Sequence, residues 1–294
     1  MSKVEASDSI DLMAVSEPLL NWAQDDLEQR LGFQGGRFTS CNKLLSFFAA
    51  ILMSALFYLF VVYCLKPFPQ TAFVAHMFLG HGIIPFPIVG LFFWAVAILT
   101  VKWRKLKYQR RALNLAAVPQ EPDFVLDRRT AAEVLKRIRT LVDDTRNFIL
   151  LNRIEHALSN LRNIGNISEA ANILRTQAQY DEEQVASSYK MVSGFVWATP
   201  VLGFIGTVLG LSLAIGGFGA TLEASGDLSA IKESLRGTTA GLSTAFETTF
   251  IALVGTLIIQ LYMTHLQHEE AMFLDECSDY CHTNLVSKLR LTDN

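Results

Sequence analysis

One apolar segment, GLSTAFETTFIALVGTLIIQLY (residues 241–262), contains four threonines and a glutamate, residue types that could do chemistry. Glu247 supplies a carboxylate, and Thr244, Thr248 and Thr249 supply hydroxyls close to it in sequence. A carboxylate at bilayer depth costs about 2.5–3.5 kcal/mol on insertion scales, so a function or a bonded partner is the default expectation. These four residues are therefore candidates for an ion path or for a contact between subunits.

A second apolar segment, WATPVLGFIGTVLGL (residues 197–211), carries small residues at helical spacing. Gly203, Gly206 and Gly210 leave one side of a helix almost bare, which lets helix backbones approach closely in lipid. Thr207 lies on this glycine-rich side, and Pro200 lacks an amide proton and loosens the helix locally. Helix packing alone is the alternative interpretation of this pattern.

The two segments place threonines at similar depths if they form antiparallel helices. Thr207 lies about 12 residues, roughly 18 Å of helix rise, from an inner boundary near Phe195. Thr249 lies about 13 residues, roughly 20 Å, from an inner boundary near Tyr262. Thr249 also belongs to a stripe of small residues, Ala245, Thr249, Ala252 and Thr256. Two hydroxyls at one level between apolar walls predict a narrow polar path.

Glu247 requires a separate interpretation, because it lies about 160° around the helix from Thr249. The two side chains therefore cannot face one path directly. We expect Glu247 near the outer end, where it serves the mouth of the path and where Lys232 or Arg236 from a loop could reach it. The structural alternative is an interfacial glutamate that is hydrogen-bonded to a neighbour such as Ser243.

Four apolar runs must position these residues. They are Leu44 to Leu65, Met77 to Val101 with its span starting near Ile83, Met191 to Leu222, and about Leu242 to His265. The first has about 22 residues, enough to cross a hydrocarbon core of roughly 30 Å. All four are long enough to span, and none is typical of a strand. The fold class predicted is an all-α integral membrane protein with four transmembrane helices and a cytoplasmic helical domain.

Basic residues next to the second run predict the orientation. They form the segment KWRKLKYQRR, with Lys102, Arg104, Lys105, Lys107, Arg110 and Arg111. The positive-inside rule places this cluster in the cytoplasm, and both termini then lie there as well. Residues 66–82 and 223–240 become short outer loops, and His76 and His81 become ordinary solvated residues of the first one.

The remaining residues predict helices in the cytoplasm. Thr130 to Glu133 (TAAE) is typical of a capping-box start, and Asn166 to Glu169 (NISE) offers a similar cap. Asn163 to Asn166 is the natural turn between these two helices, and the second could run unbroken through Tyr189. The tail after His265 continues the helical pattern. The predicted parts are an N-terminal cytoplasmic segment, helices 1–2, a cytoplasmic helical domain, helices 3–4 and a C-terminal cytoplasmic helix, at residues 1–42, 43–103, 104–190, 191–265 and 266–294.

Composition excludes several classes of function. The net charge of −3 argues against nucleic-acid binding, whereas 51% hydrophobic residues and a mean hydropathy of +0.29 are ordinary for a membrane protein. Cys41 and Cys64 do not form a disulfide pattern, and Cys277 and Cys281 are assigned as structural thiols rather than metal ligands. No catalytic constellation or phosphate loop stands out, so we expect neither an enzyme nor a bound cofactor or metal.

The two membrane motifs resemble those of a known family. ATPVLGFIGTVLGL is similar to the third-helix signature of the MotA/TolQ/ExbB proton-channel family, and GLSTAFETTFIAL is similar to its last helix. The motifs cover residues 197–211 and 241–253, and the first 190 residues resemble the family only in layout. Thr207 and Thr249 match the family's two helix threonines. A last-helix position that is often acidic in the ExbB branch falls on Thr244 here, which is a departure.

The resemblance implies a bacterial inner-membrane motor subunit that uses the proton or sodium motive force. It implies a homopentamer around a dimer of a MotB/TolR/ExbD-like protein, whose single membrane helix carries an aspartate and whose outer domain is driven. H⁺ or Na⁺ would be the transported ion, and no cofactor is implied. Two alternatives stay open, a non-conducting membrane scaffold and a stand-alone ion channel.

Overall fold

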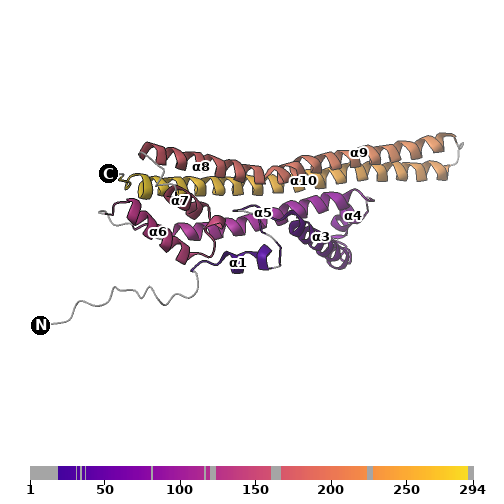
Figure 1. Cartoon of the computed structure of the whole chain (residues 1–294). Helices are drawn as coiled ribbons and strands as arrows, with labels where there is room; N and C mark the ends of the chain where they lie inside the picture. The colour runs from indigo at the N-terminus through magenta and orange to yellow at the C-terminus, as the bar shows by residue number, and fades with distance from the viewer. Residues whose placement is uncertain are drawn as a thin grey trace. The chain divides into compact units, whose positions relative to one another are not determined.

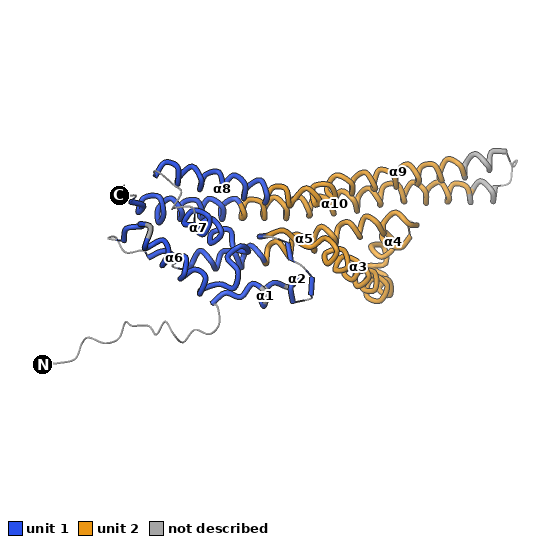
Figure 2. The backbone as a smooth tube through the Cα atoms, viewed as in Figure 1, with its two compact units in different colours: residues 1–38, 105–184, 271–294 blue, residues 39–104, 185–270 orange. Residues whose placement is uncertain are grey.

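The computed structural model describes residues 19–30, 32–33, 35–36, 38–80, 82–115, 117–119, 124–159, 167–223 and 228–290. The described residues form helices, with no strand among them beyond two isolated bridges (Figure 1). The chain divides into two compact units (Figure 2). Unit 1 contains residues 1–38, 105–184 and 271–294, and unit 2 contains residues 39–104 and 185–270.

Unit 2 contains the apolar parts of four long helices. α3 (Lys43–Phe60) continues as a π-helical turn (Val61–Leu65), and α5 spans Pro85–Leu113. α9 spans Lys190–Glu223, and α10 spans Leu228–Cys281. Each of the four apolar runs lies wholly or mostly in a helix long and apolar enough to cross a membrane, and the second such helix starts at Pro85 rather than near Ile83. This confirms that the predicted spans are helices with the length and composition to cross a membrane. A helix also bonds its backbone polar groups within its own segment, as a bilayer requires.

Local sequence explains where the first two spanning helices start. The Asn42 side chain accepts hydrogen bonds from the amides of Leu44 and Leu45, at 2.9 and 3.5 Å, and so caps α3. α5 starts at Pro85, where proline fits because first-turn amides have no partner within the helix. Pro87 lies in the same first turn, so neither proline interrupts the span.

Both segments predicted as outer loops are partly helical, so those predictions were wrong in part. Residues 66–82 contain the helix α4 (Ala72–Leu79), which includes His76. Residues 223–240 are mostly helix, because α9 runs to Glu223 and α10 already begins at Leu228. Charges at Lys232 and Arg236 favour water over lipid, but they do not disfavour a helix that extends beyond the bilayer.

The elements that were predicted to be cytoplasmic also differ in detail from the prediction. α6 (Arg128–Leu141) starts earlier than expected, because Asp127 is its N-cap and Thr130 is the third helical residue. The Asp127 carboxylate accepts from the Thr130 amide, and the Thr130 hydroxyl accepts from the Asp127 amide, each at 2.8 Å. The predicted turn at residues 163–166 and the Asn166 cap lie outside the described residues, as do His81 and residues 1–18.

The rest of the helical prediction is largely confirmed. α8 (Ile167–Ser188) is separated from α9 by the single residue Tyr189, where an unbroken helix was expected. The C-terminal tail is helical as predicted, since α10 continues to Cys281 and a π-helical turn follows (His282–Val286). The remaining helices of unit 1 are short: α1 (Trp22–Asp25), α2 (Leu27–Arg30), a 3₁₀ turn (Thr145–Asn147) and α7 (Ile149–Ser159).

An aromatic cluster and two buried ion-pair groups hold unit 1 together. Trp22, Tyr108 and Phe148 lie with ring centroids 5.3–5.7 Å apart. Arg153 donates to Asp181 at 2.6 Å, and both side chains are 1% exposed. Lys105 contacts Glu28 at 2.6 Å, so a lysine of the basic cluster is buried in an ion pair rather than solvated.

Candidate ion path between α9 and α10

Close backbone contact within unit 2 defines the site. α9 and α10 run side by side (Figure 1), and three glycines of α9, Gly203, Gly206 and Gly210, face small residues of α10. A Cβ atom on Gly203 would lie 2.7 Å from the Ala252 Cβ, and one on Gly210 would lie 2.6 Å from the Gly241 carbonyl oxygen. Real Cβ atoms do not approach other atoms so closely, so glycine is what permits this helix separation.

The remaining small residues extend the same contact. A Cβ on Gly206 would collide with the Thr248 side chain, and Ala245 and Ala252 are 1% and 0% exposed. Sequence reasoning missed Gly241, which meets Gly210 backbone to backbone. The sequence could have indicated it, because Gly241 lies four residues before Ala245 and extends the stripe of small residues by one helical turn.

The close contact gives a measurable prediction at Gly210. Gly210→Ala is expected to destabilise the folded chain by about 1–3 kcal/mol, because the new methyl group meets backbone atoms that cannot move aside cheaply. Gly194→Ala is the matched control on the same helix, since a Cβ there meets no atom within 4 Å. Thermal unfolding in detergent measures both. Equal melting temperatures for the two variants would contradict the proposed tight contact.

Pro200 does not break α9, which runs continuously through it. Proline removes one backbone donor, and the neighbouring Thr199 hydroxyl donates to the Phe195 carbonyl at 2.8 Å. Thr199 is fully buried, so this bond satisfies its hydroxyl within the helix.

The two threonine hydroxyls predicted to lie at one depth are in contact. Thr207 Oγ1 and Thr249 Oγ1 are 2.5 Å apart. Thr207 Oγ1 also lies 3.2 Å from the Gly203 carbonyl oxygen and 3.4 Å from that of Ala245. Thr249 Oγ1 lies 3.0 and 3.2 Å from the same two oxygens. The structure therefore confirms their proximity, and their part in ion movement stays a prediction.

A donor and acceptor count shows what this hydroxyl pair can bind. Two hydroxyls bring two donors and four lone pairs. One donor can go to a backbone carbonyl and the other to its partner hydroxyl, which uses one of the four lone pairs. The pair therefore retains acceptor capacity but no idle donor. Such a pair suits a proton donor or a small cation.

The other three candidates lie elsewhere on α10. Thr248 is fully buried, and its hydroxyl donates to the Thr244 carbonyl at 2.9 Å. The Thr244 hydroxyl donates to its own helix at Ala240, 3.0 Å away. Glu247 accepts a hydrogen bond from the Ser243 hydroxyl at 2.5 Å, as the structural alternative expects.

The expected approach of a loop cation to Glu247 was wrong. Lys232 and Arg236 lie on α10 itself, and Arg236 is eleven residues from Glu247, about 16 Å of helix rise. A rigid helix keeps these charges apart within one chain. Glu247 was also expected near the outer end of its helix. It lies about 28 Å of rise from Leu228, the first residue of α10, and so is far from the N-terminal end of this helix.

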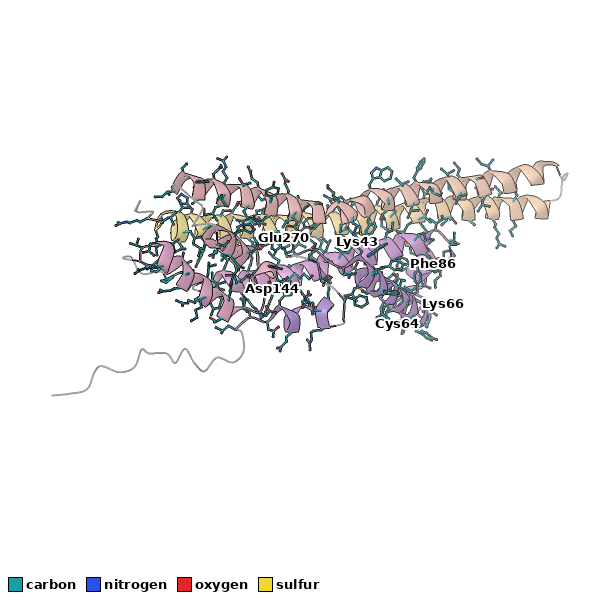
Figure 3. All side chains as sticks on the ribbon, viewed as in Figure 1. Lys43, Cys64, Lys66, Phe86, Asp144 and Glu270 are labelled. Atoms are coloured by element: carbon teal, nitrogen blue, oxygen red, sulfur yellow. The ribbon has the colours of Figure 1, made fainter. Side chains whose placement is uncertain are left out.

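A buried ion pair anchors the helices of the site within unit 2. Lys102 on α5 donates to Glu270 on α10 at 3.1 Å and to the Ser188 hydroxyl at 2.8 Å (Glu270 is labelled in Figure 3). It also donates to Thr39 at 3.3 Å and lies 4.2 Å from the Tyr189 ring centroid. An ammonium has three donors, so this lysine is fully satisfied. Sequence reasoning assigned Lys102 only as an orientation signal.

Comparison with known proteins finds one family that matches the part of the chain containing this site. The model of the MotA/TolQ/ExbB proton channel family matches residues 144–274. Both motifs lie inside this match, so the resemblance inferred from them is confirmed. No curated protein and no solved structure matches the chain. The four apolar helices and this family match together indicate a multi-pass membrane protein.

Proposed function

We propose, from the match of residues 144–274 to the MotA/TolQ/ExbB proton channel family, that this chain is the ion-conducting subunit of an inner-membrane motor. Five copies would surround two copies of a single-span protein whose membrane helix carries an aspartate. Protons or sodium ions would pass between the two proteins and drive their relative rotation. Both termini of this chain would lie in the cytoplasm, as the basic segment after the second span indicates.

The contact between Thr207 and Thr249 is the observation that carries the proposal. The pair has acceptor capacity left, which matches the needs of a protonated carboxyl group or of a sodium ion. A deprotonated carboxylate would obtain a hydrogen bond only if one threonine gave up its bond to a backbone carbonyl or to the other hydroxyl. The pair thus distinguishes the two protonation states of a partner aspartate, as an ion-driven cycle requires.

The same observation separates the proposal from its alternatives. A non-conducting scaffold would use the hydroxyls only for packing, because both can bond to backbone carbonyls within the protomer. A stand-alone channel would conduct without any second protein. The apolar surroundings of the pair favour a partner that brings the charge, since a path lined by two hydroxyls offers little stabilisation to a bare ion.

Native mass spectrometry of the tagged chain, purified from its own host in a lipid-preserving detergent, tests the proposal. We expect five copies of this chain with two copies of a small single-span protein that has a membrane aspartate. A pentamer that lacks a partner, under conditions that retain bound lipid, would contradict the motor and favour the scaffold or channel.

Glu247 gives a separate prediction about ion entry. Glu247→Gln keeps the hydrogen bond from Ser243 but removes the charge, so a role in proton entry predicts severalfold slower ion-dependent activity with normal assembly. Glu247→Leu removes both, and Ser243→Ala is the matched control that removes the bond and keeps the charge. Full activity of Glu247→Gln would show that this carboxylate has no part in ion movement.

A further inference from the structure

A cavity of about 590 Å³ lies within unit 2, between α4 and the N-terminal part of α10. Its polar lining consists of His76, Lys232, Arg236, Thr239, Ser243 and Thr244. Of the described residues that line it, none is acidic. Two permanent cations and an imidazole therefore share one cavity without a carboxylate in its wall.

Two helices contribute these groups from different parts of the chain. Lys232 and Arg236 are four residues apart and so lie on one face of α10. His76 comes from α4, where its ring lies against Gly80. A Cβ atom on Gly80 would lie 2.7 Å from the His76 Nε2 atom, so the glycine leaves space for the imidazole. Such a lining matches the charge of a phosphate group.

The same face of α10 continues from cations through hydroxyls to apolar rings. Positions Lys232, Thr239, Ser243, Phe246 and Phe250 follow one another at spacings of three, four or seven residues, which keeps them on one side of the helix. Phe246 and Phe250 are 65% and 59% exposed. The helix thus offers a cationic end and two exposed aromatic rings in one line on one side, and Glu247, which accepts a hydrogen bond from Ser243, lies between them on the same side.

The length of this line fits a lipid better than a small anion. Arg236 and Phe250 are fourteen residues apart, about 21 Å of helix rise. Half of a bilayer, head groups included, measures about 20–22 Å. A free phosphate would use only the cavity and would leave the exposed aromatic rings without a role.

We propose that this cavity binds the head-group phosphate of an anionic phospholipid, whose acyl chains lie along Phe246 and Phe250. The phosphate would contact Lys232 and Arg236, with His76 closing the opposite wall. This site does not include the Thr207–Thr249 pair, so a test of lipid binding does not depend on whether the proposed motor function is correct.

Lipid retention by the full-length chain tests the site. The purified protein is incubated with equal amounts of phosphatidylglycerol and phosphatidylcholine, and bound lipids are counted by native mass spectrometry. Wild type is expected to retain phosphatidylglycerol in preference. Lys232→Gln with Arg236→Gln should weaken this retention about 30-fold, equivalent to about 2 kcal/mol at 1.4 kcal/mol per tenfold.

Lys66→Gln is the matched control, because Lys66 is an exposed cation of unit 2 (labelled in Figure 3) that does not line the cavity. It should retain phosphatidylglycerol as wild type does. Equal retention by the double variant and by Lys66→Gln would overturn the proposal. Displacement of the lipid by millimolar inorganic phosphate would also overturn it, since the cavity would then be a site for a free anion.

Discussion

Replacing both hydroxyls, with Thr207→Val and Thr249→Val in one chain, is expected to slow ion-dependent activity by at least about 100-fold. Hydrogen bonds to charged groups contribute about 1.5–3 kcal/mol each, and this double change removes both hydroxyls that could make such bonds in the path. Valine has nearly the shape of threonine. Each lost hydroxyl also bonds to a carbonyl of its own helix, which keeps its backbone hydrogen bond, so we expect both helices to stay intact. Proton or sodium flux into vesicles containing the assembled complex measures the effect.

Two further variants identify the cause of that loss. Thr207→Ser with Thr249→Ser keeps both hydroxyls and should retain most of the flux. Thr256→Val removes a hydroxyl of the same stripe that donates to its own helix at Ala252, 2.7 Å away, and should leave assembly unchanged. Full flux in the double valine variant, with normal oligomeric state, would exclude the hydroxyl pair from the ion path.

Arg153→Met is expected to destabilise unit 1 by about 3–5 kcal/mol, because it leaves Asp181 charged and buried without its main partner. Asp181 would keep only the hydrogen bond from Gln177, at 3.1 Å. For a unit of this size the loss corresponds to a fall in melting temperature of roughly 6–20 °C. Thermal melting followed by circular dichroism, or the rate of limited proteolysis, measures it.

The controls for this variant use the same chemistry at different burial. Arg139→Met breaks the ion pair with Glu155, in which the arginine side chain is 66% exposed, and should cost at most about 1 kcal/mol. Arg153→Met combined with Asp181→Leu should recover much of the stability, since an apolar pair can replace a buried ion pair. If Arg153→Met melted like Arg139→Met, the buried pair would contribute little to unit 1.

The membrane helices could be predicted from sequence because the bilayer constrains length and polarity together. A run such as Leu44 to Leu65 admits no other structure in lipid, and Asn42 and Pro85 mark helix starts by their backbone chemistry. The meeting of Thr207 and Thr249 followed from helix rise alone, because each lies a similar number of residues from its predicted inner boundary. Regular geometry made both predictions possible.

The features that sequence reasoning missed depend on which residues meet across helices. Lys102 and Lys105 are basic residues in the same segment as exposed ones such as Arg104, and nothing in the sequence distinguishes them. In the structure each is nevertheless buried against a carboxylate. Glu270 and Glu28 lie far from them in sequence, so spacing cannot identify these pairs. The helical start of α10 was missed for a different reason, because polarity indicates water and does not distinguish a loop from a solvated helix.

The contact of Gly210 with Gly241 has a mechanical consequence. Where backbones touch directly, no layer of flexible side chains separates α9 from α10, so the two helices resist sliding past each other. Force applied to one of them is then transmitted to the other without loss of register. In an assembly of several copies, deformation would concentrate at the boundaries between copies, and each pair of helices would move as one stiff element.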